Sequence, residues 1–308
     1  MLPMKDTVRQ LLFRIPVIGT RYRDLLAAAE SHYRINPGHY ASPIPALDEI
    51  QREINSVFAT ETKEDALPGI TLHTNTQLQL LDRLRCHLAA FPFPAHATRG
   101  FRYHYLNDWF QYDDAAIFYA LLLEYRPKRI IEVGSGFSSA ILVDTIDLTD
   151  DFIPEITLIE PSSERLRGRL QAEDDSRFQL IESLVQHADP TIFDSLEDGD
   201  FLFIDSSHVS KCGSDVNVII HEILPRLKPG IIVHFHDIFY PFTYPARLLY
   251  ADQFWNEAYM LRAFLINNEK YSLMLWNDYL AQIHSQEYFS AFQSRPKNIA
   301  GSFWMRSV

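Results

Sequence analysis

The segment from Arg129 to Ser139 constrains the fold of this chain more than any other. It is an apolar run that ends in a Gly-Ser-Gly turn and is followed by apolar residues at helical spacing, which predicts a strand, a tight turn and a helix. Such a turn leaves backbone N–H groups free at a helix N-terminus, where an anionic ligand group is favoured, and glycine lets the ligand approach closely. We therefore expect a cofactor to bind over Gly134 to Gly136.

Six further apolar segments alternate with helical patterns along the rest of the chain. They predict strands over residues 155–160, 177–182, 200–205, 230–237, 271–276 and 301–306, with a helix over 215–227 among the helical segments between them. Strands that alternate with helices favour an α/β fold with a doubly wound, mostly parallel sheet, here of seven strands. We expect this Rossmann-like domain over residues 100–308, after an N-terminal helical arm and cap over residues 1–99.

Composition narrows the choice of partner. The formal net charge of -12 and the pI near 5.4 disfavour nucleic acid, because phosphate binding needs clustered Lys and Arg, so a small molecule is expected. The two cysteines, Cys86 and Cys212, form neither a disulfide framework nor a metal motif, which favours the cytoplasm. No apolar run approaches the roughly 18 residues of a membrane span, and the first residues lack a signal-peptide layout.

The first 25 residues have the opposite charge to the rest of the chain. Five basic residues against two acidic ones give this arm a charge of +3, and apolar residues lie between the bases. Such an arm could contact an anionic membrane surface peripherally, or it could pack on its own chain or on a partner subunit. The sequence leaves these two interpretations open.

Carboxylates and histidines follow the predicted strands at their carboxyl ends. Glu160 ends the second strand, Asp205 and His208 follow the fourth, and His236 and Asp237 end the fifth. Ligands of open α/β sheets bind at this edge, so these side chains are expected to share one site. Together they could bind a divalent cation or supply a general base and its orienting acid, although a histidine near a strand end is often only a hydrogen-bonded structural residue.

An aromatic, proline-containing loop follows the fifth strand, over residues 239–245. It could form the wall of an acceptor pocket and exclude water, or it could cover the hydrophobic core. The composition of the loop fits both.

Taken together, four motifs resemble class I S-adenosylmethionine-dependent methyltransferases. They are Glu-Val-Gly-Ser-Gly-Phe-Ser-Ser, Ile-Glu-Pro, Phe-Ile-Asp-Ser-Ser-His and His-Phe-His-Asp-Ile-Phe-Tyr-Pro, and the resemblance covers roughly residues 100–280. It is strongest to the small-molecule O-methyltransferase-like branch associated with glycan and natural-product genes.

The resemblance implies a set of cofactor contacts. The methionine part of S-adenosylmethionine would lie among Glu132 and the turn residues Gly134, Ser135 and Gly136. Glu160 would bind the ribose hydroxyls, and Asp205 would lie beside the cofactor.

The resemblance also implies catalytic roles. Asp205 and Asp237 occupy the positions of two metal-binding acids of catechol-type O-methyltransferases, and His208 stands where those enzymes have a lysine base. Their asparagine ligand is replaced by Ile238, so Mg²⁺ or another divalent cation would need His236 as a substitute ligand, or the reaction would use no metal. We interpret His208 as the base, with Asp205 and Asp237 positioning it or holding a metal.

The expected function is methyl transfer to a hydroxyl of a small molecule, with a sugar or glycan precursor as the favoured acceptor and self-association of the chain as a further expectation. A nicotinamide-dependent oxidoreductase would share the turn and the acid, but its fingerprint needs glycine where this chain has Ser139. A catalytically idle binding or assembly module with the same fold is the other alternative.

Overall fold

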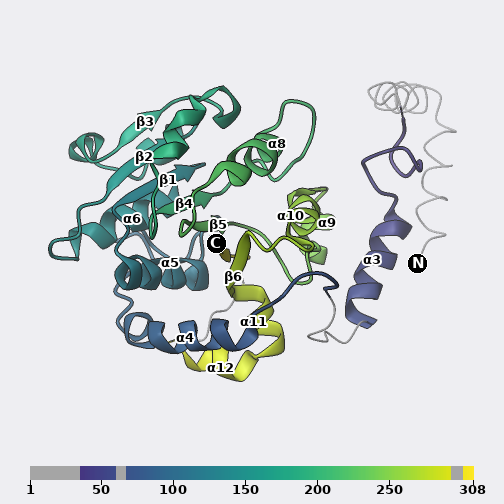
Figure 1. Ribbon diagram of the computed structural model, residues 1–308, viewed down its shortest axis with the longest axis horizontal. Helices are drawn as coiled ribbons and strands as arrows, with labels where there is room; N and C mark the ends of the chain where they lie inside the picture. The colour runs from purple at the N-terminus through teal and green to yellow at the C-terminus, as the bar shows by residue number, and fades with distance from the viewer. Residues whose placement is uncertain (1–34, 60–66, 293–300) are drawn as a thin grey trace, which may run out of the picture. The chain divides into compact units, whose positions relative to one another are not determined.

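The protein is described here by a computed structural model that covers residues 35–59, 67–292 and 301–308 (Figure 1). The chain divides into two compact units, residues 1–61 and 62–308. The described part of the first unit contains helix α3 (Leu47–Ala59), whose first turn carries Asp48 and Glu49, where negative charge is favourable. The basic arm that the sequence predicts over residues 1–25 lies outside the described residues.

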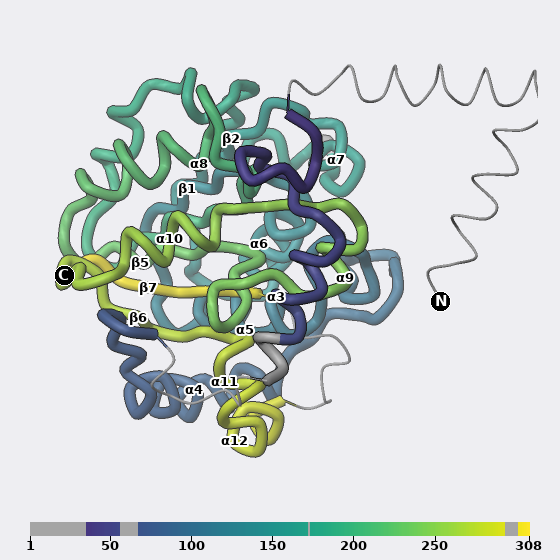
Figure 2. Tube along the Cα trace, turned by 90° about the vertical axis from the view of Figure 1, so that its right-hand side faces the viewer, coloured from purple at the N-terminus to yellow at the C-terminus, as the bar shows by residue number. Residues whose placement is uncertain are grey.

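The second unit is built on a seven-stranded sheet with the order β3-β2-β1-β4-β5-β7-β6. The strands are β1 (Arg129–Val133), β2 (Glu155–Ile159), β3 (Gln179–Ile181), β4 (Phe201–Ile204), β5 (Ile232–Phe235), β6 (Tyr271–Trp276) and β7 (Phe303–Ser307). Strands β1 to β5 pair in parallel, whereas β7 is antiparallel to β5 and to β6. Figure 2 shows β5, β7 and β6 side by side at one edge. The doubly wound, mostly parallel seven-stranded sheet predicted from the sequence is confirmed.

Helices cover both faces of this sheet. In Figure 1, α5 (Tyr112–Tyr125) and α6 (Phe137–Asp147) lie on one side, and α8 (Asp215–Val218) and α10 (Glu257–Leu265) lie on the other. The remaining helices of the unit are α4 (Thr74–Ala89), α7 (Glu164–Arg167), α9 (Ala246–Leu249), α11 (Asn277–Ile283) and α12 (Ser285–Ser290). None of these described helices is long and apolar enough to cross a bilayer.

Helix α4 belongs to the sheet unit by its packing. It lies against α5 and β6, and the buried side chain of Gln77 donates to the carbonyl oxygen of Leu72 and accepts from the backbone N–H of Trp276 at 2.9 Å. The hydrogen bond to Trp276 joins α4 to the end of β6. The domain boundary between residues 99 and 100 stays a prediction.

The predicted helix over residues 215–227 is helical but not uniform. After α8 the backbone widens into a π-helical turn over Ile219–Ile223 and then tightens into a 3₁₀ turn over Leu224–Arg226. Pro225 has no N–H to donate, so a regular α-helix cannot continue through it.

The register of the central strands brings the site residues together. Val133 pairs with Ile204, and Ile204 pairs with Phe235, so β1, β4 and β5 end at the same level. The ladder continues one step further, because the N–H of Asp205 donates to the oxygen of Val133 at 2.8 Å and the N–H of His236 donates to the oxygen of Ile204 at 2.9 Å. The residues that follow these three strands therefore meet at one edge of the sheet.

Candidate active site

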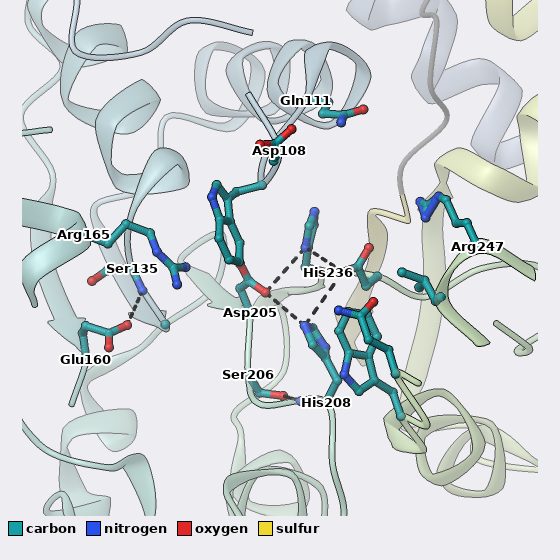
Figure 3. A pocket seen from close by; sticks show the side chains of 16 residues that line it. Asp108, Gln111, Ser135, Glu160, Arg165, Asp205, Ser206, His208, His236 and Arg247 are labelled. Atoms are coloured by element: carbon teal, nitrogen blue, oxygen red, sulfur yellow. Dashed lines mark hydrogen bonds and ion pairs between the residues drawn. The ribbon is translucent and has the colours of Figure 1, made fainter. Parts of the chain in front are cut away.

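A pocket of about 560 Å³ opens at the carboxyl ends of β1, β2, β4 and β5 (Figure 3). This volume falls within the range of roughly 300–1,000 Å³ typical of small-molecule sites. The pocket is lined by Asp108, Trp109, Gln111, Gly134, Ser135, Glu160, Arg165, Asp205, Ser206, His208, His236, Asp237, Arg247, Leu248, Gln253 and Trp255. The sequence prediction that the strand-end groups share one site therefore agrees with their positions in the structure.

The glycine turn forms one wall of the pocket. Gly134 has φ +81°, and a Cβ there would lie 2.0 Å from the carbonyl oxygen of Asp205, so only glycine fits between β1 and β4. The N–H of Ser135 donates to Oε2 of Glu160 at 3.0 Å. The side chain of Ser135 is 7% exposed, and its Oγ is buried without a hydrogen-bond partner. The turn thus presents an unsatisfied hydroxyl at the pocket.

Glu132 lies behind this turn and does not line the pocket. Its carboxyl group is buried and accepts hydrogen bonds from the hydroxyls of Ser138 and Ser139, the latter at 2.8 Å. The N–H of Gly136 donates to Ser139 Oγ at 3.2 Å. Burial raises the pKa of Glu132 to about 8, although the two serine hydroxyls act in the opposite direction. These hydrogen bonds fix the start of α6. A glycine at position 139 would remove the two that involve the hydroxyl of Ser139.

Four side chains meet at the centre of the pocket and form what we call the His–Asp cluster: Asp205, His208, His236 and Asp237. Nε2 of His208 lies 3.4 Å from Oδ1 of Asp205 and 3.9 Å from Oδ2 of Asp237. Nδ1 of His236 lies 3.5 Å and 3.6 Å from the same two oxygens. Each histidine therefore turns one ring nitrogen towards both aspartates.

The backbone of the cluster is strained at two positions. His208 has φ +59° and Asp237 has φ +56°, a left-handed conformation that is uncommon for residues other than glycine. Non-glycine residues in such regions cost of order 1–3 kcal/mol each and concentrate at functional sites. Here the strained conformation places both side chains in the pocket.

His208 is held from behind by Glu257, which the sequence analysis missed. Nδ1 of His208 lies 2.8 Å from Oε2 of Glu257, and Oε1 of Glu257 accepts from the hydroxyl of Ser206 at 2.7 Å. Burial alone would lower the pKa of His208, but Asp205 and Glu257 overcome this effect and raise it to about 10. The ring therefore carries a proton at pH 7 and is paired with carboxylates on both sides.

His236 is held in the same way by Asp114. Nε2 of His236 lies 3.1 Å from Oδ2 of Asp114, whose Oδ1 accepts from the N–H of Ser302 at 3.0 Å and from Nδ2 of Asn277 at 3.2 Å. Burial would lower the pKa of His236, but the charges of Asp237 and Asp205 and the contact with Asp114 raise it well above its usual value. Asp114, in the first turn of α5, therefore holds the buried ring of His236 in position.

Asp205 is correspondingly acidic. Burial would raise the pKa of Asp205, but His236 and His208 hold it well below its usual range. Among the described residues, no group of three or more His, Cys, Asp and Glu side chains is placed to hold a metal ion. The predicted ligands Asp205, Asp237 and His236 are arranged as ion pairs between histidine and aspartate.

The pocket has two further walls on opposite sides of the His–Asp cluster. On the side of the glycine turn, which we call the turn side, the guanidinium of Arg165 lies 3.9 Å from the ring centre of Trp109. On the other side, which we call the α9 side, the wall consists of Arg247, Leu248, Gln253 and Trp255. The ring of Trp255 lies 4.4 Å from that of His208.

The aromatic loop over residues 239–245 does not line the pocket. Its side chains Phe239, Tyr240, Phe242 and Tyr244 are buried, and the ring of Phe242 packs at 4.6 Å against Trp276. Of the two alternatives, the loop therefore covers the core, and the segment directly after it forms the wall. The sequence analysis did not identify Arg247 or Trp255 as residues of this wall.

The fold and the pocket define the class of the protein: it is a doubly wound α/β protein with a pocket over the first βα turn. The region from residue 131 to 238 matches the model of a family described as a methyltransferase domain. An uncharacterized protein of Archaeoglobus fulgidus is 34% identical over 165 residues, which is 53% of this chain and 73% of the relative. The chain therefore contains a methyltransferase domain over residues 131–238 and is a relative of the archaeal protein.

Solved structures with similar topology include two methyltransferases with a bound product. The SAH-bound methyltransferase of Podospora anserina has a TM-score of 0.41 and 15% identity, over 87% of this chain and 99% of that one. An O-methyltransferase of Bacillus cereus in complex with SAH has a TM-score of 0.43 and 13% identity, over 85% and 100% of the two chains.

Proposed function

We propose that this protein is a methyltransferase that uses S-adenosylmethionine to methylate a hydroxyl of a small molecule. The observation that carries the proposal is that a single pocket contains both the glycine turn and the inward-facing ring nitrogens of His208 and His236. The first feature suits the cofactor, and the second can exchange a proton with a hydroxyl.

The residues of the turn side fit the cofactor. Ser135 offers a buried hydroxyl without a partner, and Glu160 lies at the edge of the pocket with a half-exposed carboxylate. We assign Glu160 to the ribose hydroxyls, and Gly134 and Ser135 to the methionine part, with Asp205 beside it. Glu132 and Gly136 act from behind by fixing the turn.

The chemistry needs alignment and a proton acceptor. When bound, S-adenosylmethionine supplies the methyl group and the positive charge of its sulfonium. The protein must hold the hydroxyl oxygen in line with the methyl carbon and the sulfur, and such positioning can lower a barrier by up to about 7–11 kcal/mol.

We assign the role of base to His208. With a pKa near 10 its ring is protonated at pH 7, so it becomes a base only where a neighbouring positive charge lowers that pKa. A cation bound on the turn side would act in this direction. Glu257 then fixes the proton on Nδ1 and leaves Nε2, which faces the pocket, to accept the proton of the hydroxyl. Asp205 and Asp237 position the ring in this role.

A metal at Asp205, Asp237 and His236 stays a prediction from the sequence. A divalent cation there would have to displace the proton on His236, because metals bind the neutral imidazole. No step of the proposed reaction passes through a metal.

The identity of the acceptor is a separate question. A sugar or glycan precursor, and membership of the branch associated with glycan and natural-product genes, remain predictions from the sequence resemblance. The same holds for cytoplasmic location, self-association and the contact of the basic arm with a membrane.

Isothermal titration calorimetry tests the proposed function. We expect S-adenosylmethionine and S-adenosylhomocysteine to bind, NADH not to bind, and S-adenosylhomocysteine to form when hydroxylated acceptors are supplied. Binding of NADH in place of the sulfonium cofactor would contradict the proposal. Cofactor binding without product formation by any acceptor would instead favour the idle binding module.

A further inference from the structure

The His–Asp cluster separates two halves of the pocket. Figure 3 shows Glu160 and Arg165 on the turn side of Asp205, and it shows Arg247 on the opposite side. If the cofactor occupies the turn side, the acceptor must lie on the α9 side, because the two reactants have to meet at the cluster. The side chains of the α9 side therefore describe the acceptor.

Arg247 is the cation of that side. Its side chain is exposed, and its guanidinium lies 5.3 Å from the ring centre of the buried Phe239. In Figure 3 the guanidinium points from its backbone towards the His–Asp cluster. Within the described part of the chain, Arg247 makes no ion pair and no hydrogen bond.

The carboxylates near Arg247 are already engaged with other groups. Asp237 and Asp205 face the ring nitrogens of His208 and His236 at 3.4–3.9 Å. Asp278 is buried, and its Oδ2 accepts from the N–H of Tyr240 and from the side-chain amide of Gln282, both at 2.7 Å. The charge of Arg247 acts on the carboxylate of Asp278, whose pKa it lowers, but within the described part of the chain no carboxylate forms an ion pair with Arg247.

A planar guanidinium with free donors favours a carboxylate or a phosphate, which it can bind through two parallel hydrogen bonds. The surrounding wall supports a ligand of this kind, because Trp255 offers an aromatic face and Gln253 an amide. We infer that the methyl acceptor is an anionic hydroxy compound whose carboxylate or phosphate group is bound by Arg247. That the anion is the methyl acceptor rests on the proposed function. The binding of an anion by Arg247 does not depend on methyl transfer.

Calorimetry on the full chain tests the site with simple probes. Benzoate and inorganic phosphate would be titrated into the protein saturated with S-adenosylhomocysteine, with benzamide as the uncharged match of benzoate. We expect at least one anion to bind, and benzamide to bind at least tenfold more weakly than benzoate if benzoate is the preferred anion. Arg247→Gln should lower the affinity for the anion by about 10- to 100-fold. Arg247→Lys should lower it by less, because lysine keeps the charge and loses only the two parallel hydrogen bonds.

Two control variants locate the effect. Arg262→Gln changes a cation of α10 outside the pocket, and Arg165→Gln changes the cation of the turn side. Both should leave anion affinity within about twofold of the parent. Absence of binding by both anions would overturn the inference, and so would a loss of affinity in Arg165→Gln with none in Arg247→Gln.

The titrations are repeated without S-adenosylhomocysteine. If S-adenosylhomocysteine itself does not bind, the proposed function fails, while the anion titrations still report on Arg247. If it binds and Arg247→Gln has no effect on the anions, the inference fails and the proposed function stands. Unchanged melting temperatures of the variants would show that each difference arises in the pocket.

Discussion

Nδ1 of His208 lies 2.8 Å from Oε2 of Glu257, although the two residues are 49 positions apart in the sequence. Glu257 is 1% exposed and His208 is 7% exposed, so the pair is shielded from water. The contact is reinforced by the backbone, since the N–H groups of Asn256 and Glu257 both donate to the carbonyl oxygen of His208. The start of α10 thus fixes both the backbone and the ring of His208.

Glu257→Gln tests whether this pair serves the reaction. We expect turnover to fall by about 10- to 100-fold and affinity for S-adenosylhomocysteine to stay within about twofold, because Glu257 acts on His208 and does not line the pocket. His208→Ala should cost more, about 10²- to 10⁴-fold, if the ring is the base. Formation of S-adenosylhomocysteine measures turnover, and calorimetry measures affinity.

A spectroscopic readout separates positioning from general support of the fold. Nitrogen-15 spectra of the histidine rings should show a changed signal for His208 in Glu257→Gln and an unchanged one in Glu269→Gln, which replaces an exposed glutamate. A parent-like ring signal together with unchanged turnover would show that Glu257 is only a structural partner.

The part of the site that could be predicted from the sequence consists of residues next to strand ends. Glu160, Asp205, His236 and Asp237 follow apolar runs directly, and parallel register brings such positions together whatever the rest of the chain does. The partner Glu257 could not be predicted this way, because its contact with His208 depends on how α10 docks on the loop after β4. The sequence pattern therefore predicts which residues lie at the carboxyl edge of the sheet. The contacts that hold these residues, such as that of Glu257 with His208, depend on tertiary packing.

Asp114 shows a second limit of sequence interpretation. Acidic residues in the first turn of a helix are explained by the helix dipole, which is a local and sufficient reason. In the structure Asp114 is 0% exposed and contacts His236, which is 122 residues away. The local rule explains an acidic residue at this position, but it does not predict the contact with His236.

Glu160→Gln is expected to lower the affinity of the protein for the cofactor. The carboxylate accepts from the N–H of Ser135 at 3.0 Å and from the N–H of Ser162 at 2.8 Å, and the amide can replace only one acceptor oxygen. Charge-assisted hydrogen bonds contribute about 1.5–3 kcal/mol, which corresponds to roughly 10- to 100-fold in affinity. Calorimetry with S-adenosylhomocysteine measures the change.

The matched control is Glu155→Gln, at the opposite end of the same strand, where the side chain is exposed. Its cofactor affinity should equal that of the parent. Equal affinities for the Glu160 and Glu155 variants would remove Glu160 from the cofactor site.

Asp278 should make stability depend on pH. Burial raises its pKa to about 7 in the folded protein, although hydrogen bonds from Tyr240 and Gln282 act in the opposite direction. The folded state then binds more protons than the unfolded state between about pH 4 and 7, so this group lowers the free energy of unfolding as the pH rises, by up to about 1.4 kcal/mol per pH unit. Asp278→Asn should therefore gain stability relative to the parent between pH 5 and pH 7.5.

Urea unfolding at the two pH values measures that difference. Asp151→Asn, at an exposed position, should show the same pH dependence as the parent. A difference between Asp278→Asn and the parent that does not change with pH would contradict a raised pKa at Asp278.

Gly134→Ala should be the most damaging small substitution in the turn. The added Cβ would lie 2.0 Å from the carbonyl oxygen of Asp205, and the residue has φ +81°. We expect a loss of roughly 3–5 kcal/mol in the free energy of unfolding, which combines the strain of a left-handed backbone with overpacking against β4. Gly199→Ala provides the control, since Gly199 has φ +85° and no heavy atom within 4 Å of the added Cβ. It should cost only about 1–2 kcal/mol and leave cofactor affinity unchanged. Equal losses in the two variants would mean that backbone strain alone, and not the contact with Asp205, reserves position 134 for glycine.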